Sequence, residues 1–209
     1  MAEARERVTL RVWSDYLCPW CHQGNHRLSA LRDASDGRIE LDFRAFLLRP
    51  HPTDSRNHEK FVRYTESWQR PAAEPDAAPF SPWSSEEGPP SHSVPAHLVA
   101  KAARRVSEEG FRTLHELLLR AYFVESRDIS RRENLVLLWE RAGLPPADFA
   151  LSELPELLEQ VVDEHNQGIE LGVTGVPAVG VDGLDAAIVG AHPRALYERL
   201  AERALAGLI

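Results

Sequence analysis

The stretch Ser14-Asp15-Tyr16-Leu17-Cys18-Pro19-Trp20-Cys21-His22 decides the fold of this chain. It contains the only two cysteines of the sequence, Cys18 and Cys21, separated by two residues. On the first turn of a helix, two thiols at this spacing can close a small disulfide ring. The motif therefore indicates a redox site.

The residues on either side of the motif predict a strand before it and a helix after it. Apolar residues alternate with other residues over 8–13, which is typical of a strand. Leu28 and Leu31 lie three apart behind polar residues, as in a helix. Pro19 fits the first turn of that helix, because a missing N–H costs nothing there.

This arrangement gives the two thiols different roles. Cys18 is expected at the helix N-terminus, where free N–H groups and the helix dipole favour a thiolate. A thiolate is the nucleophile of disulfide exchange, and Cys21, one turn further along, can resolve the mixed disulfide. We also expect only Cys18, and not Cys21, to be exposed.

Three other interpretations of the motif compete with a redox role. The sequence from Cys18 to His22 matches the signal for covalent c-type haem attachment. Attachment would require export, yet 1–7 contains no apolar signal core, and Met1 is the only methionine available as an axial ligand. A zinc site needs two further ligands, and His22 with His26 does not complete a persuasive set, so we predict no metal. Two inert buried cysteines would not be separated by Pro-Trp.

Composition limits the class of protein. The 209 residues can form one large domain, or one domain with an insertion, and 43% of them are hydrophobic. Asp and Glu (32) outnumber Lys and Arg (24), giving a net charge of -8, which argues against nucleic acid and anionic membranes as partners. A single cysteine pair and an N-terminus without a signal core favour the cytoplasm. The oligomeric state is left open.

The middle of the chain is predicted to be mostly helical. A turn at Asp36-Gly37 leads into a strand over 39–46, and a right-handed crossover makes this strand parallel to the first one. Residues 55–70 are weakly helical. The stretch 71–95 has seven prolines, four acidic residues and no Lys or Arg, which predicts a loop without regular structure. It is either a lid carrying Phe80 and Trp83 to the active site or a solvated connector, and we favour the connector.

Helical patterns follow this loop, and sheet patterns return near the end. One helix is predicted from Ala96 to Gly110, others follow, and Ser130-Arg-Arg-Glu133 has the spacing of a capping box. A helix over 155–170 carries His165 on its apolar side, where a hydrogen-bonded core histidine is expected. Strands over 178–181 and 186–189 are joined by a tight turn, so they are antiparallel. The last helix begins near Pro193.

This order of elements resembles the DsbA family of thiol–disulfide oxidoreductases, and more specifically its FrnE-like branch. The resemblance is carried by Asp15-x-x-Cys-Pro-Trp-Cys21, by Arg120-Ala-Tyr-Phe with Arg127-Asp-Ile-Ser130, and by Gly172-Val-Thr-Gly-Val-Pro177. It implies an α/β thioredoxin-like fold with an inserted all-helical subdomain. The thioredoxin-like domain would comprise 1–50 and 168–209, and the insertion 51–167. The Pro-rich loop departs from the family pattern.

The resemblance also implies site residues. Cys18 would be the attacking thiol, Cys21 the resolving thiol and Pro177 a cis-proline facing them. A cis bond after Val176 would turn the backbone so that its polar groups can pair with an extended peptide. Thr174 would shape this loop, and Val176, Trp20 and Thr174 would contact the substrate. The alternative for Pro177 is an ordinary proline at the start of a strand.

Three further residues are candidates for tuning the thiols. Trp20 either sets the environment between the cysteines or covers the helix end. His22 either favours the Cys18 thiolate or lies in solvent. Asp15 either relays protons near Cys21 or serves as a turn or cap residue.

The function predicted from the sequence is that of a protein disulfide oxidoreductase acting on protein or peptide thiols and disulfides. It needs no bound cofactor beyond the redox-active Cys18–Cys21 pair, with glutathione or another thiol as electron donor. The direction of exchange depends on the compartment and the redox potential. One alternative is a glutathione-dependent isomerase resembling 2-hydroxychromene-2-carboxylate isomerase, a family that usually lacks the paired cysteines. Another is a non-catalytic, redox-gated peptide-binding chaperone.

Overall fold

Four strands form one sheet in the order β2-β1-β3-β4 in the computed structural model, which describes residues 6–53 and 57–209. The two N-terminal strands are parallel, with Val8 opposite Ile39, as predicted. The hairpin predicted near the C-terminus is confirmed, and its first strand lies antiparallel to β1, with Leu10 opposite Val181. The strands are β1 (Val8–Ser14), β2 (Ile39–Ala45), β3 (Ala178–Val181) and β4 (Ala187–Val189).

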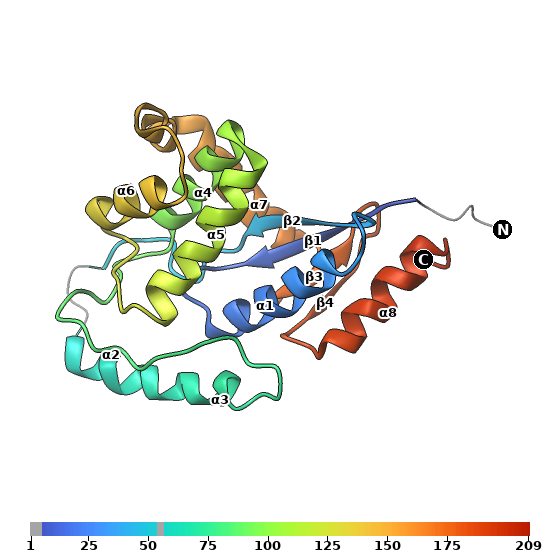
Figure 1. Cartoon of the computed structure of the whole chain (residues 1–209), viewed down its shortest axis with the longest axis horizontal. Helices are drawn as coiled ribbons and strands as arrows, with labels where there is room; N and C mark the ends of the chain where they lie inside the picture. The colour runs from blue at the N-terminus through green and yellow to red at the C-terminus, as the bar shows by residue number, and fades with distance from the viewer. Residues whose placement is uncertain (1–5, 54–56) are drawn as a thin grey trace.

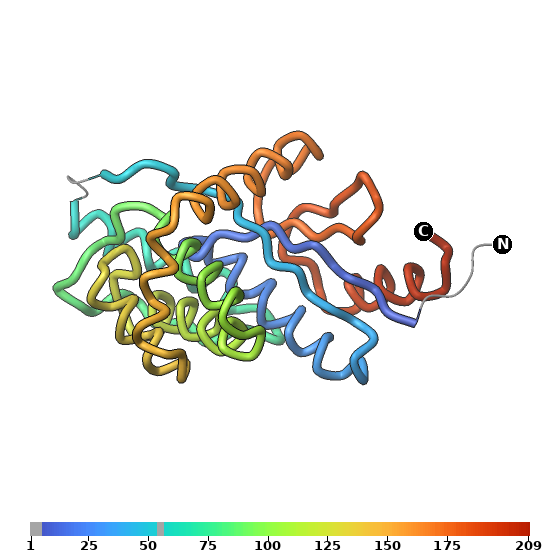
Figure 2. The backbone as a smooth tube through the Cα atoms, turned by 90° about the horizontal axis from the view of Figure 1, so that it is seen from above, coloured from blue at the N-terminus to red at the C-terminus, as the bar shows by residue number. Residues whose placement is uncertain are grey.

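Helices cover both faces of this sheet and extend beyond one end of it. α1 and α7 lie on opposite sides of β1 and β2 (Figure 2). The helices between 94 and 141 gather at one end of the molecule, and α8 lies at the other (Figure 1). The α-helices are α1 (Pro19–Asp33), α2 (His58–Thr65), α3 (Gln69–Ala72), α4 (Val94–Val106), α5 (Glu108–Phe123), α6 (Arg132–Arg141), α7 (Pro155–Glu170) and α8 (Arg194–Leu205), with 3-10 helices η1 (Glu66–Trp68) and η2 (Pro146–Glu153).

The inserted helices and the sheet share one apolar core. Leu10 of β1, Leu28 of α1, Leu114 of α5 and Trp139 of α6 are fully buried in the same cluster. The inserted helices thus pack on the sheet through a continuous interior. The predicted division of the chain into domains at residues 50 and 168 stays a prediction.

Two predicted helix boundaries are wrong. Gly110 does not end a helix: the break falls at Ser107, whose side chain accepts the Gly110 N–H and starts α5. Ser130 does not cap α6, which begins at Arg132; its hydroxyl donates to Asp128 instead. In both places a serine side chain makes a local hydrogen bond, Ser107 as acceptor and Ser130 as donor, and this local bonding accompanies the shifted boundary.

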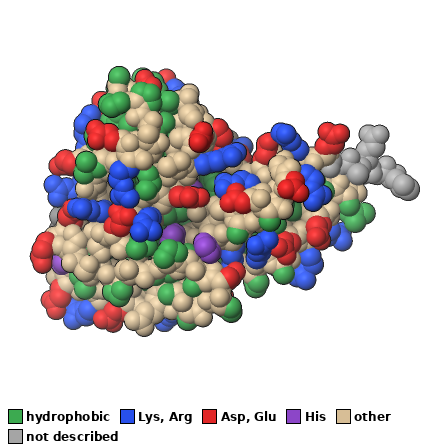
Figure 3. All heavy atoms as spheres, in the orientation of Figure 1, with side chains coloured by type: hydrophobic (Ala, Val, Ile, Leu, Met, Phe, Trp, Pro, Cys, Tyr) green, Lys and Arg blue, Asp and Glu red, His purple; other side chains and the backbone are tan. Residues whose placement is uncertain are grey.

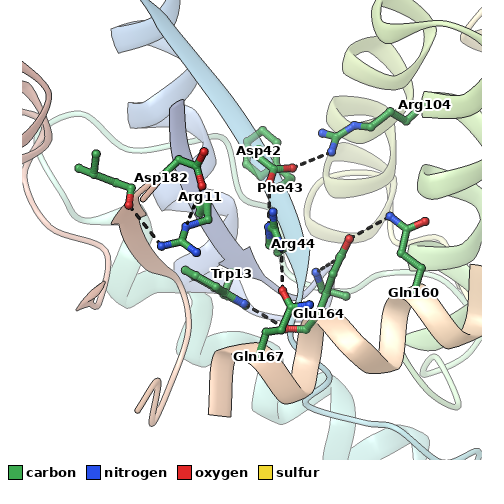
Figure 4. Close-up of polar contacts among 12 residues, drawn as sticks. Arg11, Trp13, Asp42, Phe43, Arg44, Arg104, Gln160, Glu164, Gln167 and Asp182 are labelled. Carbon is green, nitrogen blue, oxygen red and sulfur yellow. Dashed lines mark hydrogen bonds and ion pairs between the residues drawn. The ribbon is translucent and has the colours of Figure 1, made fainter. Parts of the chain in front are cut away.

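A buried ion pair holds α4, α7 and β2 together. Lys101 Nζ of α4 lies 2.6 Å from Glu164 Oε1 of α7 and donates to the Phe43 carbonyl of β2 at 3.0 Å. Glu164 Oε2 accepts the Ala45 N–H at 2.7 Å. Gln160, Glu164 and Gln167 all point from α7 toward β2 and α4 (Figure 4). These contacts fix which face of α7 is turned toward the sheet.

Across the described ranges, no helix combines the length and the apolar character needed to cross a membrane.

Candidate active site

Cys18 is the N-cap residue of α1. Its backbone is extended, with φ -96° and ψ 114°, and Pro19 occupies the first helical turn, as the sequence predicts. The Cys18 Sγ accepts the N–H of Cys21 at 3.2 Å. A sulfur at this position faces the unpaired N–H groups of the helix terminus, which stabilise negative charge.

Cys21 lies one turn further, deeper in the protein. Only 1% of Cys21 is exposed, against 5% of Cys18, and neither thiol is in a disulfide. Burial raises the pKa of the Cys21 thiol well above its usual value, and the hydrogen bond and charge of Cys18 raise it further. The expectation that Cys18 is exposed is wrong, because both thiols are buried. The order of their accessibility is nevertheless the predicted one.

The loop before β3 brings Val176 to the Cys18 thiol and Pro177 to α1. The Cys18 thiol donates to the Val176 carbonyl at 3.4 Å, and the Val176–Pro177 peptide bond is cis. Pro177 is buried and lies against α1, so that a Cβ placed on Gly24 would be 3.0 Å from the Pro177 Cγ. Of the loop residues predicted to bind substrate, Val176 is half-buried and Thr174 is exposed.

Sequence reasoning missed Gly24. A glycine inside a helix costs about 1 kcal/mol relative to alanine, so its presence signals a close approach of another segment. The sequence does not say which segment approaches, because the partner, Pro177, lies far along the chain.

Asp15 acts as a turn residue in this structure, which is one of its two predicted roles. Its side chain is fully buried, and it accepts the Leu17 N–H at 2.7 Å and the Leu48 N–H at 2.8 Å. The Asp15 carbonyl accepts the Cys18 N–H at 3.1 Å. The carboxylate thereby joins the turn before the dithiol to the segment that follows β2. Trp20 is half-buried on the first turn of α1.

His22 is not solvent-exposed. Its ring is buried, stacks on Phe123 with centroids 5.0 Å apart and donates from Nε2 to the Pro79 carbonyl at 3.0 Å. Burial lowers the pKa of His22 to about 4, although the hydrogen bond to Pro79 partly opposes this. A neutral ring held by the loop offers no positive charge to Cys18 at neutral pH.

The Pro-rich stretch, predicted to be a loop over 71–95, is irregular over 73–93, since its ends belong to α3 and α4. It is not a solvated connector, because Ala78 and Trp83 are buried. It is a strap that packs on α1 and α5. Trp83 is buried and meets Phe61 and Tyr122, while Phe80 meets His22. Trp83 lies in the interior, and the partly buried Phe80 packs against the same core.

Arg27 of α1 anchors the strap by a set of contacts that sequence reasoning also missed. This arginine is 2% exposed, and its Nε donates to Asp76 Oδ2 at 2.9 Å and its Nη2 to Glu74 Oε2 at 2.9 Å. Its Nη1 donates to the carbonyl of Ala191, just before α8, at 2.9 Å. One buried guanidinium therefore joins α1, the strap and the segment leading to α8.

The fold and the placement of the dithiol can be compared with known proteins. A DsbA-like thioredoxin domain model matches residues 9–201, nearly the whole chain. The chain belongs to this family. The DsbA-like family comprises thiol–disulfide oxidoreductases, and the chain is an enzyme of this class, with Cys18 and Cys21 as its C-x-x-C pair.

Solved structures of low sequence identity share the DsbA-like fold. A protein from Nitrosomonas europaea aligns with a TM-score of 0.77 at 18% identity, covering 97% of each chain. A probable DsbA oxidoreductase from Streptomyces coelicolor aligns with a TM-score of 0.75 at 22% identity, covering 96% of this chain and 91% of its own. The cytosolic disulfide reductase DsbM from Pseudomonas aeruginosa has a TM-score of 0.69 at 20% identity, covering 96% of each chain.

No curated protein sequence matches the chain. Among the residues that the structure describes, no group of three or more His, Cys, Asp or Glu side chains is placed to hold a metal ion.

Proposed function

We propose that this DsbA-like enzyme exchanges the Cys18/Cys21 dithiol with disulfides of proteins or peptides, in the reductive direction and in the cytoplasm. The observation that carries the proposal is the contact of 3.4 Å between the Cys18 Sγ and the Val176 carbonyl, which places the backbone of the loop before β3 beside the nucleophile. A single cysteine pair, with no further cysteines for a disulfide framework, suits a reducing compartment. The structural similarity to cytosolic DsbM supports the same compartment.

The reaction begins at Cys18. Its thiolate attacks one sulfur of the substrate disulfide, the substrate S–S bond breaks, and a mixed disulfide forms while the displaced substrate thiolate takes up a proton. The Val176 carbonyl no longer receives the Cys18 S–H, so it can accept an N–H of the substrate backbone. The substrate backbone is then held against the loop before β3, because β3 itself is already paired with β1 and β4.

Cys21 completes the reaction. It loses its proton and attacks the Cys18 sulfur, which forms the Cys18–Cys21 disulfide and releases the second substrate thiol. The substrate has gained two electrons and the enzyme has lost two. Glutathione or another small thiol returns them by two successive exchanges, and one structure of DsbM contains glutathione, which supports such a donor.

A trapping experiment tests this function. Cys21→Ser leaves the attacking thiol but removes the resolving one, so substrates should accumulate on Cys18 as covalent adducts that dithiothreitol releases. Cys18→Ser is the matched control and should trap nothing. Absence of adducts on Cys21→Ser would exclude the proposed exchange.

The same variants separate the two alternatives. A chaperone would keep its peptide-holding activity in Cys18→Ser and in Cys21→Ser. A glutathione-dependent isomerase would turn over its small substrate without any mixed disulfide to protein.

A further inference from the structure

α7 has more apolar surface than the fold covers. One row of its side chains, comprising Leu157, Val161, Glu164 and Gly168, is buried against the sheet. The next row around the helix is Leu158, Val162, His165 and Ile169, at the spacing of one helical stripe. Leu158 is 45% exposed, Val162 40% and Ile169 53%. A line of exposed apolar side chains along three turns of a helix marks a surface for another molecule.

One side of this row leads to the dithiol through the segment after β2. His165 Nδ1 accepts the Leu47 N–H at 3.1 Å, which holds that segment beside the row. The next residue, Leu48, is 48% exposed, and its N–H is held by Asp15 Oδ2 at 2.8 Å. Asp15 belongs to the turn that positions Cys18. Leu48 therefore extends the apolar surface toward the nucleophile.

The C-terminal end of the row leads to the same place through a second loop. The Ile169 carbonyl accepts the Gly172 N–H at 2.9 Å, and the chain then runs directly to Val176, which contacts the Cys18 Sγ. The apolar row thus lies between the two loops that meet at the dithiol. A polypeptide joined to Cys18 through one of its own cysteines can continue onto α7.

Charge identifies the kind of polypeptide. The row next to the apolar one carries Glu159, Asp163 and Glu170, all exposed. Glu159 and Asp163 line a hollow that also contains Arg44, Arg104 and Arg105, but the ion pairs of these arginines in the described structure are with other carboxylates. By contrast, acidic and basic side chains are interspersed over the face shown in Figure 3. Three exposed carboxylates beside an apolar line complement Lys and Arg. A second copy of this chain would instead bring like charges together across the contact.

We propose that the α7 face, defined as Leu48, Leu158, Val162 and Ile169 with Glu159, Asp163 and Glu170, docks polypeptide substrates that carry apolar and basic residues near the reacting cysteine. The proposal rests on the proposed function and names its substrate class. Docking there raises the local concentration of the substrate disulfide at Cys18 and leaves the chemical step unchanged.

The test compares three disulfides on one enzyme. The probes are a short peptide with an internal disulfide flanked by Leu and Lys, the same peptide with Ser and Glu in those places, and oxidised glutathione. In a variant with Leu158→Gln, Val162→Gln and Ile169→Gln, we expect KM for the Leu/Lys peptide to rise about tenfold. Its kcat and the turnover of oxidised glutathione should stay within about twofold. Leu137→Gln, at a site 55% exposed on α6, is the control and should change nothing.

A second variant tests the charge. Glu159→Gln with Asp163→Asn and Glu170→Gln should abolish the preference for the Leu/Lys peptide over the Ser/Glu peptide, as should about 1 M salt in the wild type.

Each outcome bears on one proposal. An unchanged KM for the Leu/Lys peptide, or an equal loss with oxidised glutathione, overturns docking on α7 while exchange itself stands. A wild-type dimer that the triple Gln variant dissociates in sedimentation also overturns it, because a second copy then covers the face. If the wild type reacts with none of the three disulfides, the proposed function itself is excluded.

Discussion

Cys21 lies deeper than Cys18, three positions before it, and burial of the Cys21 thiol decides which of the two reacts first. Cys18 receives an N–H at the helix terminus, whereas the pKa of Cys21 is raised, mainly by burial. At neutral pH we expect limiting iodoacetamide to label Cys18 at least about tenfold faster than Cys21, since the thiolate is the reactive form. Labelling of Cys21 should increase as pH rises. Peptide mapping by mass spectrometry measures both, and faster labelling of Cys21 at neutral pH would reverse the assigned roles.

His22 makes stability depend on pH. The pKa of its ring is held at about 4 in the folded protein, against 6.5 ordinarily. Between these values the unfolded chain binds a proton that the folded protein does not, so the free energy of unfolding falls as pH drops from 6.5 to 4. Titration of His22 lowers the free energy of unfolding by about 3 kcal/mol over this pH range.

His22→Phe keeps the stacking on Phe123 and removes the titrating group, so urea unfolding between pH 7 and 4 should show a flatter decline than in the wild type. Part of the decline should remain, because burial also lowers the pKa of His115. Equal slopes for the two proteins would contradict the buried, neutral His22.

For a single residue, the sequence predicts the chemical role better than it predicts the burial and the contacts of the side chain. The positions of Cys18 and Cys21 on the first turn follow from Pro19 and the strand-to-helix change in pattern. The burial of His22 does not, because it is produced by Phe123 and by Pro79 on a strap with no regular structure. The expected exposure of Cys18 failed because a loop far along the chain brings the Val176 carbonyl to its sulfur.

At the scale of elements, α1 and the loop before β3 meet at Gly24 and Pro177. Gly24→Ala gains helix propensity worth about 1 kcal/mol, but its methyl group would lie 3.0 Å from the Pro177 Cγ and push the loop away from Cys18. We expect kcat/KM for a peptide disulfide to fall about tenfold, while the midpoint of urea unfolding changes little. Ser29→Ala on the same helix is the control. Full activity in Gly24→Ala would show that the loop does not need its present position.

The packing of the strap on α1 should depend on Asp76. Asp76→Ala removes the main partner of the buried Arg27 guanidinium, and leaving such a group underpaired costs about 1–3 kcal/mol. We expect lower stability and faster proteolysis within 73–93, read by limited digestion. Asp33→Ala removes an exposed partner of Arg32 and should cost at most about 0.5 kcal/mol. Equal losses in the two variants would mean that Arg27 is not the anchor.

Most helices and strands were predictable, because the spacing of apolar residues indicates their type and turn residues mark their ends. Alternation over 8–13 and the Asp182-Gly183 turn located β1 and the hairpin correctly. The errors at Gly110 and Ser130 arose where a serine hydrogen bond set the helix start, a choice that depends on backbone geometry. The packing of the strap on α1 rests on Arg27, whose partners are far along the chain.

Over the whole molecule, Lys101 and Glu164 tie the inserted helices to the sheet. Burial lowers the pKa of Lys101, and the nearby carboxylate of Glu164 opposes this shift. Lys101→Met leaves a buried carboxylate without its cation and should lower the free energy of unfolding by about 3–5 kcal/mol. The double variant with Glu164→Leu should recover much of that loss. Urea unfolding decides this, and a double variant no more stable than the single one would refute it.

The same pair has a consequence for how molecules meet in concentrated solution. β2 is an outer strand of seven residues, and successive backbone groups point to alternate sides, so those of Phe43 and Ala45 face away from β1. Lys101 occupies the Phe43 carbonyl and Glu164 the Ala45 N–H. A strand from a neighbouring molecule finds these groups already taken, and the other outer strand, β4, is only three residues long. The sheet is thereby protected against edge-to-edge growth into aggregates.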